Sequence, residues 1–275
     1  MLDQLDTASW DNSIWGYYKK HMKQSLNNSN FSNGSSFLDY YNNFYKSLSK
    51  LDEKGNTFKK IKSMLPELGG KEKIIDIGCG HGGVCHYLID QGYDVTGIEI
   101  NDDAIKSLQE KGYNVLKKDI TKGFDIHEKY DLVLILDVLE HVFDPVFLIS
   151  EAIKITAKNG SIIISVPLYF DLLDRLKILF TGSVISMDNL CYGKENYKKF
   201  KSYNYDHIRF FRPSEMLEIG DKLGLKLAKI EYKKPVYYGE SRFLSLLHRL
   251  IFNKYFVSFN PSLFAHSMKI RWQLT

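Results

Sequence analysis

Residues 76–83 read Asp-Ile-Gly-Cys-Gly-His-Gly-Gly, and this stretch decides the fold. It closes a short β-branched run, KIIDI at residues 73–77, and opens a segment of helical character that continues through Ile89. Glycines at such a turn let the backbone pass close to a ligand, and the helix N-terminus behind them offers unpaired N–H groups. Because Gly78, Gly80 and Gly83 also fit the common dinucleotide pattern G-x-G-x-x-G, the loop alone does not identify its ligand.

The same alternation of short apolar runs and helical segments continues beyond the loop. The runs are KIIDI (73–77), DVTGIEI (94–100), NVLKKDI (114–120), DLVLIL (131–136) and SIIISVP (161–167). Helices are expected at 102–111 and 146–157, between successive runs. Buried strands separated by helices predict an α/β protein with a doubly wound, mostly parallel sheet.

The flanking regions extend this core. We expect an N-terminal helical cap over residues 1–60, where aromatic residues follow a helical period in 37–51. The second domain is expected to cover 61–275, with insertions at 168–206 and 236–260 on the substrate side. Within it, Pro213–Leu223 predicts a helix, Lys226–Tyr232 a strand, Ser241–Phe256 a basic apolar helix and Leu263–Leu274 a last strand.

Acidic residues stand at the ends of the first four predicted strands. Glu99 follows Gly80 by 19 residues and can accept hydrogen bonds from both hydroxyls of a ribose. Asp76 suits a ligand that carries an ammonium group, and Asp119 can accept the amino hydrogens of an adenine. Asp137 ends the fourth strand. Because ligands bind at the carboxyl ends of the strands in open α/β sheets, these acids predict a site for a nucleoside-containing ligand.

As a set, these residues resemble the class I S-adenosylmethionine-dependent methyltransferases. The matching segments, in order, are DIGCGHGG (76–83), GIEI (97–100), KKDI (117–120), DLVLILDVLEHVFDP (131–145) and NGSIIISVP (159–167), with a weaker match at 207–227. The resemblance implies a Rossmann-like sheet of seven strands with a reversed final strand, which 263–274 could provide. It also implies S-adenosylmethionine as cofactor and S-adenosylhomocysteine as product.

The resemblance assigns parts of the cofactor to parts of the chain. The loop from Gly78 to Gly82 would hold the methionine part, Glu99 the ribose, and Asp119 with Ile120 the adenine. The expected cofactor-binding residues are therefore Asp76, Gly78, Cys79, Gly80, Gly82, Glu99, Ile100, Asp119, Ile120 and Asp137. The Asn/Asp-Pro-Pro-aromatic signature of nucleobase methyltransferases is replaced by Asp137-Val138-Leu139-Glu140, so we expect no nucleic-acid substrate.

The phrase LEHVFDP (139–145) is similar to that of ubiquinone-biosynthesis and sugar-modifying O-methyltransferases. We expect a hydroxyl acceptor on a small molecule, first a free, phosphorylated or nucleotide-linked sugar of surface polysaccharide biosynthesis. A quinone or lipid-linked hydroxyl is the alternative. His141 or His207 is expected to serve as general base, since the ordinary imidazole pKa of about 6.5 suits that role. Glu140 could orient His141 or help to hold a cation, but no third ligand stands at a recognisable spacing, so we expect no metal.

Charge is unevenly distributed along the chain. The net charge is only +4, yet residues 186–275 hold 16 Lys and Arg against 8 Asp and Glu. Arg209 and Arg212 in this part would suit an anionic acceptor. The helix at 241–256 has the composition either of a cap helix or of one that lies on a membrane surface.

Composition limits the remaining possibilities. Three cysteines without a C-x-x-C pair, and no secretion signal or apolar run of about 18 residues, predict a cytoplasmic protein. Two other functions stay open: an NAD-dependent oxidoreductase, and a module that binds the cofactor without catalysis. The fit of a methyltransferase to all five segments makes it the main expectation.

Overall fold

The computed structural model describes residues 61–168, 170–181, 207–235 and 242–275. The chain divides into two compact units, Met1–Ser47 and Leu48–Thr275, and every described residue belongs to the second. The cap expected at 1–60 and most of the insertion at 168–206 thus lie outside the described residues. None of the helices within the described ranges is both long and apolar enough to cross a membrane.

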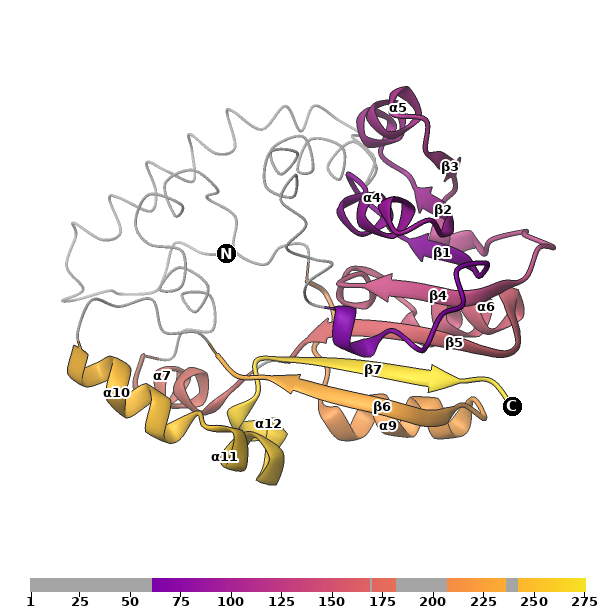
Figure 1. The fold of residues 1–275 in the computed structure, drawn as a ribbon. Coiled ribbons are helices and arrows are strands. Elements are labelled where there is room, and N and C mark those ends of the chain that lie inside the picture. The colour runs from indigo at the N-terminus through magenta and orange to yellow at the C-terminus, as the bar shows by residue number, and fades with distance from the viewer. Residues whose placement is uncertain (1–60, 169, 182–206, 236–241) are drawn as a thin grey trace, which may run out of the picture. The chain divides into compact units, whose positions relative to one another are not determined.

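Seven strands form one sheet in the order β3-β2-β1-β4-β5-β7-β6 (Figure 1). Their bounds are β1 Lys73–Ile77, β2 Asp94–Glu99, β3 Asn114–Lys117, β4 Tyr130–Leu136, β5 Thr156–Pro167, β6 Lys226–Lys233 and β7 Ser267–Gln273. Neighbours among β1 to β5 run parallel, whereas β7 runs antiparallel to both β5 and β6. This confirms the predicted doubly wound sheet with a reversed final strand.

The register of β1 aligns the ends of three strands. Ile77 pairs with Ile98 on β2 and with Ile135 on β4. These parallel strands therefore finish at one edge, where open α/β sheets bind their ligands. The segments that follow them, including the glycine loop, all leave the sheet at this edge.

Helices cover both faces of the sheet. Their bounds are α4 Gly83–Asp90, α5 Asp102–Glu110, α6 Pro145–Ile155, α7 Leu172–Thr181, α9 Pro213–Lys222, α10 Arg242–Ile251, α11 Lys254–Phe259 and α12 Pro261–Phe264. Asn101 caps α5 by accepting a hydrogen bond from the Ala104 N–H, and Asp144 caps α6 through the Phe147 N–H. Asn101 lies two residues after the end of β2, whereas Asp144 follows the short 3-10 turn Leu139–His141 that comes after β4.

The core has two layers because side chains alternate along each strand. Ile75 and Ile77 of β1 pack into the layer formed with α6, α9 and α11, while Ile74 packs into the layer formed with α4 and α5. All three are fully buried. A strand buried on both faces explains why KIIDI is almost continuously apolar.

Two predicted elements have different bounds in the structure. The helix expected at 241–256 is broken into α10 and α11, because Asn253 accepts a hydrogen bond from the Phe256 N–H and starts a new helix. The last strand begins at Ser267 rather than at 263, because Pro261–Phe264 forms the short helix α12. The other strands and helices predicted within the described residues are found within a few residues of their expected positions.

Gly220 allows α9 to approach the sheet closely. A Cβ atom at this position would lie 2.6 Å from the Trp272 ring, which is itself buried in β7. Gly220→Ala should therefore overpack this contact and lower the free energy of unfolding by about 1–3 kcal/mol, as measured by urea denaturation. The exposed neighbour Asp221→Ala should stay within about 0.5 kcal/mol of wild type. Equal stability of the two variants would contradict the close contact.

Candidate functional site

The glycine loop has the backbone conformation that only glycine adopts readily. Gly78, Gly80 and Gly82 have φ angles of 73°, 54° and 74°, in the left-handed region. A Cβ atom on Gly78 would lie 2.7 Å from Val138, which follows β4, whereas one on Gly80 would meet no atom within 4 Å. The first glycine thus lets the loop approach the end of β4, and Gly80 leaves open space beside its backbone.

Glu99 links the glycine loop to β2. Its Oε2 accepts a hydrogen bond from the Gly80 N–H at 2.8 Å, and its Oε1 accepts from the N–H groups of Ile100 and Asn101 at 2.7 and 2.8 Å. The residue is only 4% exposed. Because a carboxylate offers about four acceptor positions, at least one remains for a ligand hydroxyl.

Asp76 lies close to two cysteines, Cys79 in the loop and Cys85 on α4. The Cys85 thiol donates to Asp76 Oδ2 at 3.5 Å, and all three side chains are buried. A hydrogen bond with Cys79, together with burial, raises the pKa of Cys85 well above its usual range. The contact with Cys85 lowers the pKa of Cys79, but burial and the charges of Asp76 and Glu99 outweigh it, so that pKa is also raised. Both thiols are therefore protonated at neutral pH.

Asp119 follows β3 at the same edge, next to Ile120. Its Oδ1 accepts hydrogen bonds from the N–H and hydroxyl of Thr121 at 3.0 and 2.6 Å, and its Oδ2 forms an ion pair with Lys122 at 3.1 Å. Burial raises its pKa, but these contacts outweigh burial, and the net effect lowers it. Asp119 is thus a half-buried carboxylate that is ionised at neutral pH.

Asp137 follows β4 in a conformation that is uncommon for a residue with a side chain. Its φ is 54°, and it is held by Ser165 at the end of β5. The Ser165 hydroxyl donates to Asp137 Oδ1 at 2.6 Å, and the Asp137 N–H donates to the Ser165 carbonyl at 3.1 Å. Strained backbone supported by its surroundings is typical of functional sites. Sequence reasoning missed Ser165, because its role depends on β5 lying beside β4.

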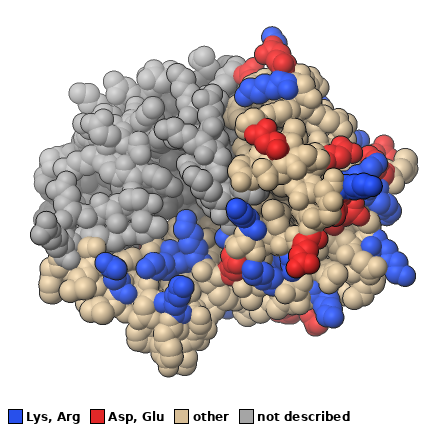
Figure 2. All heavy atoms as spheres, in the orientation of Figure 1, with Lys and Arg blue, Asp and Glu red and all other residues tan. Residues whose placement is uncertain are grey.

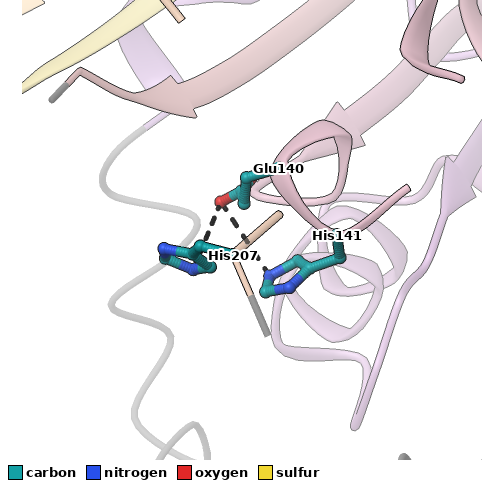
Figure 3. Close-up of side chains that lie close together, drawn as sticks. All are labelled: Glu140, His141 and His207. Carbon is teal, nitrogen blue, oxygen red and sulfur yellow. Dashed lines mark ion pairs between the residues drawn. The ribbon is translucent and has the colours of Figure 1, made fainter. Parts of the chain in front are cut away.

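Beyond Asp137, one carboxylate and two imidazoles meet (Figure 3). Oε1 of Glu140 lies 4.0 Å from Nε2 of His141 and 4.0 Å from Nε2 of His207. The two imidazole rings meet edge to face, with 4.7 Å between their centroids. Glu140 is buried, and both histidine side chains are less than one fifth exposed. We call these residues the Glu140 cluster.

Backbone hydrogen bonds bring His207 to this place. The Glu140 carbonyl accepts from the N–H groups of Ile208 and Arg209 at 2.8 and 3.1 Å, and Phe211 pairs with Leu168 after β5. The structure therefore places both predicted base residues together. It also adds Glu140 as their common neighbour, a role that the sequence indicated only for His141.

The Glu140 cluster can perform two kinds of chemistry. An imidazole beside a carboxylate can accept a proton from a bound hydroxyl. The three side chains also offer ligand atoms within 4.8 Å of one another, a set that could hold a divalent cation. The expectation that no metal takes part remains a prediction.

The two arginines expected to bind substrate already have partners. Arg209 Nε donates to the Phe143 carbonyl at 3.0 Å, and Arg212 forms an ion pair with Glu215 at 2.6 Å. Arg212 lines a cavity of about 380 Å³ together with Phe170, Arg175, Ile178, Phe210, Phe211 and Glu215. This cavity combines aromatic rings with two guanidinium groups, so its walls are more apolar than the sequence suggested. A role for Arg209 and Arg212 in substrate binding remains a prediction.

A family comparison fits this geometry. The family model described as a methyltransferase domain matches residues 50–230, which include the glycine loop, Glu99, the Glu140 cluster and α9. The chain belongs to this family. It is a class I S-adenosylmethionine-dependent methyltransferase, as the resemblance implied, and S-adenosylmethionine is its cofactor.

Curated relatives of this methyltransferase include two that are identical to it at about a quarter of the aligned positions. The ubiquinone biosynthesis O-methyltransferase of Photobacterium profundum is 26% identical over 162 residues, which cover 56% of this chain and 64% of that protein. The protein of the same name from Saccharophagus degradans is 27% identical over 167 residues, covering 58% and 66%. The match thus spans less than two thirds of the length of these relatives.

Solved structures share the fold at lower identity. A SAM-dependent methyltransferase from Archaeoglobus fulgidus superposes with a TM-score of 0.51 at 20% identity, covering 87% of this chain and 100% of that one. An S-adenosylmethionine-dependent methyltransferase from Mesorhizobium loti gives a TM-score of 0.52 at 15% identity, covering 81% and 99%. At these identities, the two similarities show a shared fold and nothing more.

The residues of this methyltransferase fit the cofactor. The open space at Gly80 adjoins Glu99, whose remaining acceptor capacity suits a ribose hydroxyl. Nε2 of His81, in the same loop, is buried without a hydrogen-bond partner among the described residues. The ionised carboxylate of Asp119 would favour a cationic, adenosine-bearing molecule at this edge, while contacts of Asp76 and Asp119 with the cofactor remain a prediction. A dinucleotide as ligand, the alternative left open by the loop alone, does not agree with the family.

Glu99→Gln should weaken cofactor binding. The amide replaces one acceptor oxygen by an NH₂ group that faces a backbone N–H, so the loop loses a charged hydrogen bond worth about 1.5–3 kcal/mol. The dissociation constant for S-adenosylhomocysteine, measured by calorimetry, should rise by about 10- to 100-fold. Asp102→Asn, which changes an exposed acid on α5, should leave it unchanged. Glu99→Gln with wild-type affinity would show that the carboxylate does not support the site.

The buried thiols should react slowly in the folded protein. An exposed cysteine with a pKa near 8.5 reacts much faster at pH 9 than at pH 7. Because their pKa values are raised, Cys79 and Cys85 should show little alkylation by iodoacetamide over this range, with mass spectrometry used to locate the label. Unfolding in urea should restore fast labelling of both. Rapid labelling of either cysteine in the folded protein would contradict their burial.

Proposed function

We propose that the protein transfers the methyl group of S-adenosylmethionine to a hydroxyl oxygen of a small, lipophilic molecule of the quinone class. The observation that carries this proposal is the Glu140 cluster, which lies after β4. β4 is the neighbour of β1, and β1 carries the glycine loop. The contact between the Gly78 position and Val138 brings the loop close to this segment. A proton acceptor beside a methyl donor suits transfer to oxygen.

When bound, S-adenosylmethionine supplies an electrophilic methyl carbon on a sulfonium, which leaves as neutral S-adenosylhomocysteine. The remaining work belongs to the chain: to hold the acceptor hydroxyl in line and to accept its proton. His141 or His207 takes that proton on an imidazole nitrogen as the new oxygen–carbon bond forms. The proton later leaves to solvent, since both histidine side chains keep partial exposure.

Glu140 acts here as a positioning residue. Its carboxylate lies 4.0 Å from both imidazoles, so it can orient either ring. Its backbone carbonyl also holds the segment that carries His207. One residue thereby keeps both histidines in place.

The acceptor class rests on two observations. The relatives reported above carry the name ubiquinone biosynthesis O-methyltransferase, which favours the quinone alternative over the sugar expected first. The cavity beside the His207 segment is lined by Phe170, Phe210 and Phe211, rings that suit an aromatic or aliphatic acceptor better than a sugar. Its arginines are engaged with Glu215 and with backbone carbonyl groups, which lowers the attraction for a free phosphate.

A methyl-transfer assay tests the proposal. Labelled S-adenosylmethionine is offered with an alkyl-substituted catechol or, separately, with a sugar phosphate, and the methylated product is identified by mass spectrometry. We expect product from the catechol. His141→Ala or His207→Ala should lower turnover about 10²- to 10⁴-fold, with the affinity for S-adenosylhomocysteine within about twofold of wild type. His86→Ala, at an exposed site on α4, is the matched control.

Three results would contradict this account. Wild-type turnover in both histidine variants would remove the proposed base. Product from the sugar phosphate alone would restore the acceptor expected first from the sequence. Activity that EDTA abolishes and Mg²⁺ restores would assign the Glu140 cluster to a metal ion instead of a proton-accepting imidazole.

A further inference from the structure

We propose that α7, α10 and α11 form a docking surface for an anionic lipid membrane. This inference concerns where the protein works and does not depend on the methyl-transfer reaction. The sequence left open whether 241–256 is a cap helix or a membrane-surface helix. The structure shows which side chains of these helices are exposed, and this exposure favours the membrane-surface helix. It also shows an exposed apolar face on α7, which the sequence did not indicate.

The outward face of α10 is apolar. Phe243, Leu246, Leu247 and Leu250 recur at the spacing of one helix face, and each is more than two fifths exposed. The opposite side of the helix packs inward through the buried His248, whose ring centroid lies 4.7 Å from that of the fully buried Phe252. A cap helix would turn its apolar side inward and its polar side outward. In α10 a large apolar side faces outward instead.

α11 and α7 continue this surface. Tyr255 and Phe259 on α11 lie parallel with 6.4 Å between their ring centroids, and Phe259 is 75% exposed. On α7, Leu176, Leu179 and Phe180 are exposed, Phe180 to 80%. Monomeric soluble proteins seldom expose so many large apolar side chains on adjoining elements, so this surface has a partner.

Contacts show that these helices are neighbours. Arg175 on α7 donates to the carbonyl of Ser262 on α12 at 2.8 Å. Phe264 on α12 contacts the rings of Phe252, directly after α10, and of Phe256 on α11. Figure 1 shows α7, α10, α11 and α12 grouped at the end of the sheet beyond β6 and β7. We call the exposed apolar side chains of α7, α10 and α11 the apolar face.

Charge selects an anionic membrane as the partner. Residues 241–275 contain five Lys and Arg and not one Asp or Glu. Arg249 and Lys254 lie on α10 and α11 among the exposed rings, and Figure 2 shows blue without red where these helices lie. A helix with aromatic and aliphatic side chains on its outer side and cations beside them is typical of segments that lie in the headgroup region. A quinone-class acceptor would be reached from the same surface.

Vesicle flotation with the full chain tests the proposal. Vesicles of phosphatidylcholine with one third phosphatidylglycerol should carry most of the protein to the top of a gradient at 50 mM salt. Pure phosphatidylcholine vesicles should carry several-fold less, and 0.5 M salt should reduce binding to the anionic vesicles. No flotation with anionic vesicles at low salt would overturn the proposal.

Paired variants locate the surface. Leu246→Gln with Leu250→Gln should reduce flotation at least fivefold, whereas Leu217→Gln with Leu227→Gln, at exposed apolar positions on α9 and β6, should not. Arg249→Glu with Lys254→Glu should have a similar effect, and Lys106→Glu with Lys111→Glu on and after α5 should not. Binding of S-adenosylhomocysteine and circular dichroism establish that each variant is folded. If a control pair lost as much flotation as its test pair, or if Leu246→Gln with Leu250→Gln lost none, the apolar face would not be the membrane contact.

Analytical sedimentation tests whether a second copy of the protein, and not a membrane, covers the apolar face. If wild type ignores vesicles but dimerises, and Leu246→Gln with Leu250→Gln makes it monomeric, a second copy covers the apolar face and the proposal is wrong. The flotation experiment and the methyl-transfer assay test separate proposals. A protein that floats but methylates no hydroxyl contradicts only the proposed function, and one that methylates but never floats contradicts only the membrane surface.

Discussion

The hydrogen bonds of the Glu99 carboxylate are the interaction on which the site depends. A buried carboxylate is costly unless it is hydrogen-bonded, and here three backbone N–H groups from the glycine loop and the turn after β2 satisfy it. The same bonds fix the loop against β2, while Gly78 lets it approach Val138 after β4. The cofactor residues and the Glu140 cluster are therefore positioned by one short region of the sheet edge.

Much of the fold could be predicted from sequence because the central strands β1 and β4 are buried on both faces and so appear as nearly continuous apolar runs. The reversed strand β7 was expected only through a family resemblance, since its alternating pattern does not specify its direction. The break between α10 and α11 was not expected. The apolar period continues through 241–256, and Asn253 becomes a cap only when it accepts the Phe256 N–H.

The functional site, like the fold, could be predicted from the sequence only in part. The acids after each strand could be placed from sequence, because parallel strands end at one edge. The meeting of His207 with Glu140 depends on backbone hydrogen bonds between segments far apart in the chain, which no local pattern indicates. The partner of Arg209, the Phe143 carbonyl, lies 66 residues away in the chain and could not be identified beforehand. The partner of Arg212, Glu215, lies only three residues along the chain, and the sequence analysis did not consider this local pair. The uneven charge of the chain now has a physical counterpart: acids at the cofactor edge, and cations beside the apolar face.

A crystal structure of the protein with S-adenosylhomocysteine bound tests the central claim most directly. The account predicts ribose hydroxyls on Glu99, the adenine beside Asp119 and Ile120, and the sulfur directed toward His141 and His207. Density that placed the adenosine away from Glu99, or the sulfur on the side remote from the Glu140 cluster, would contradict it.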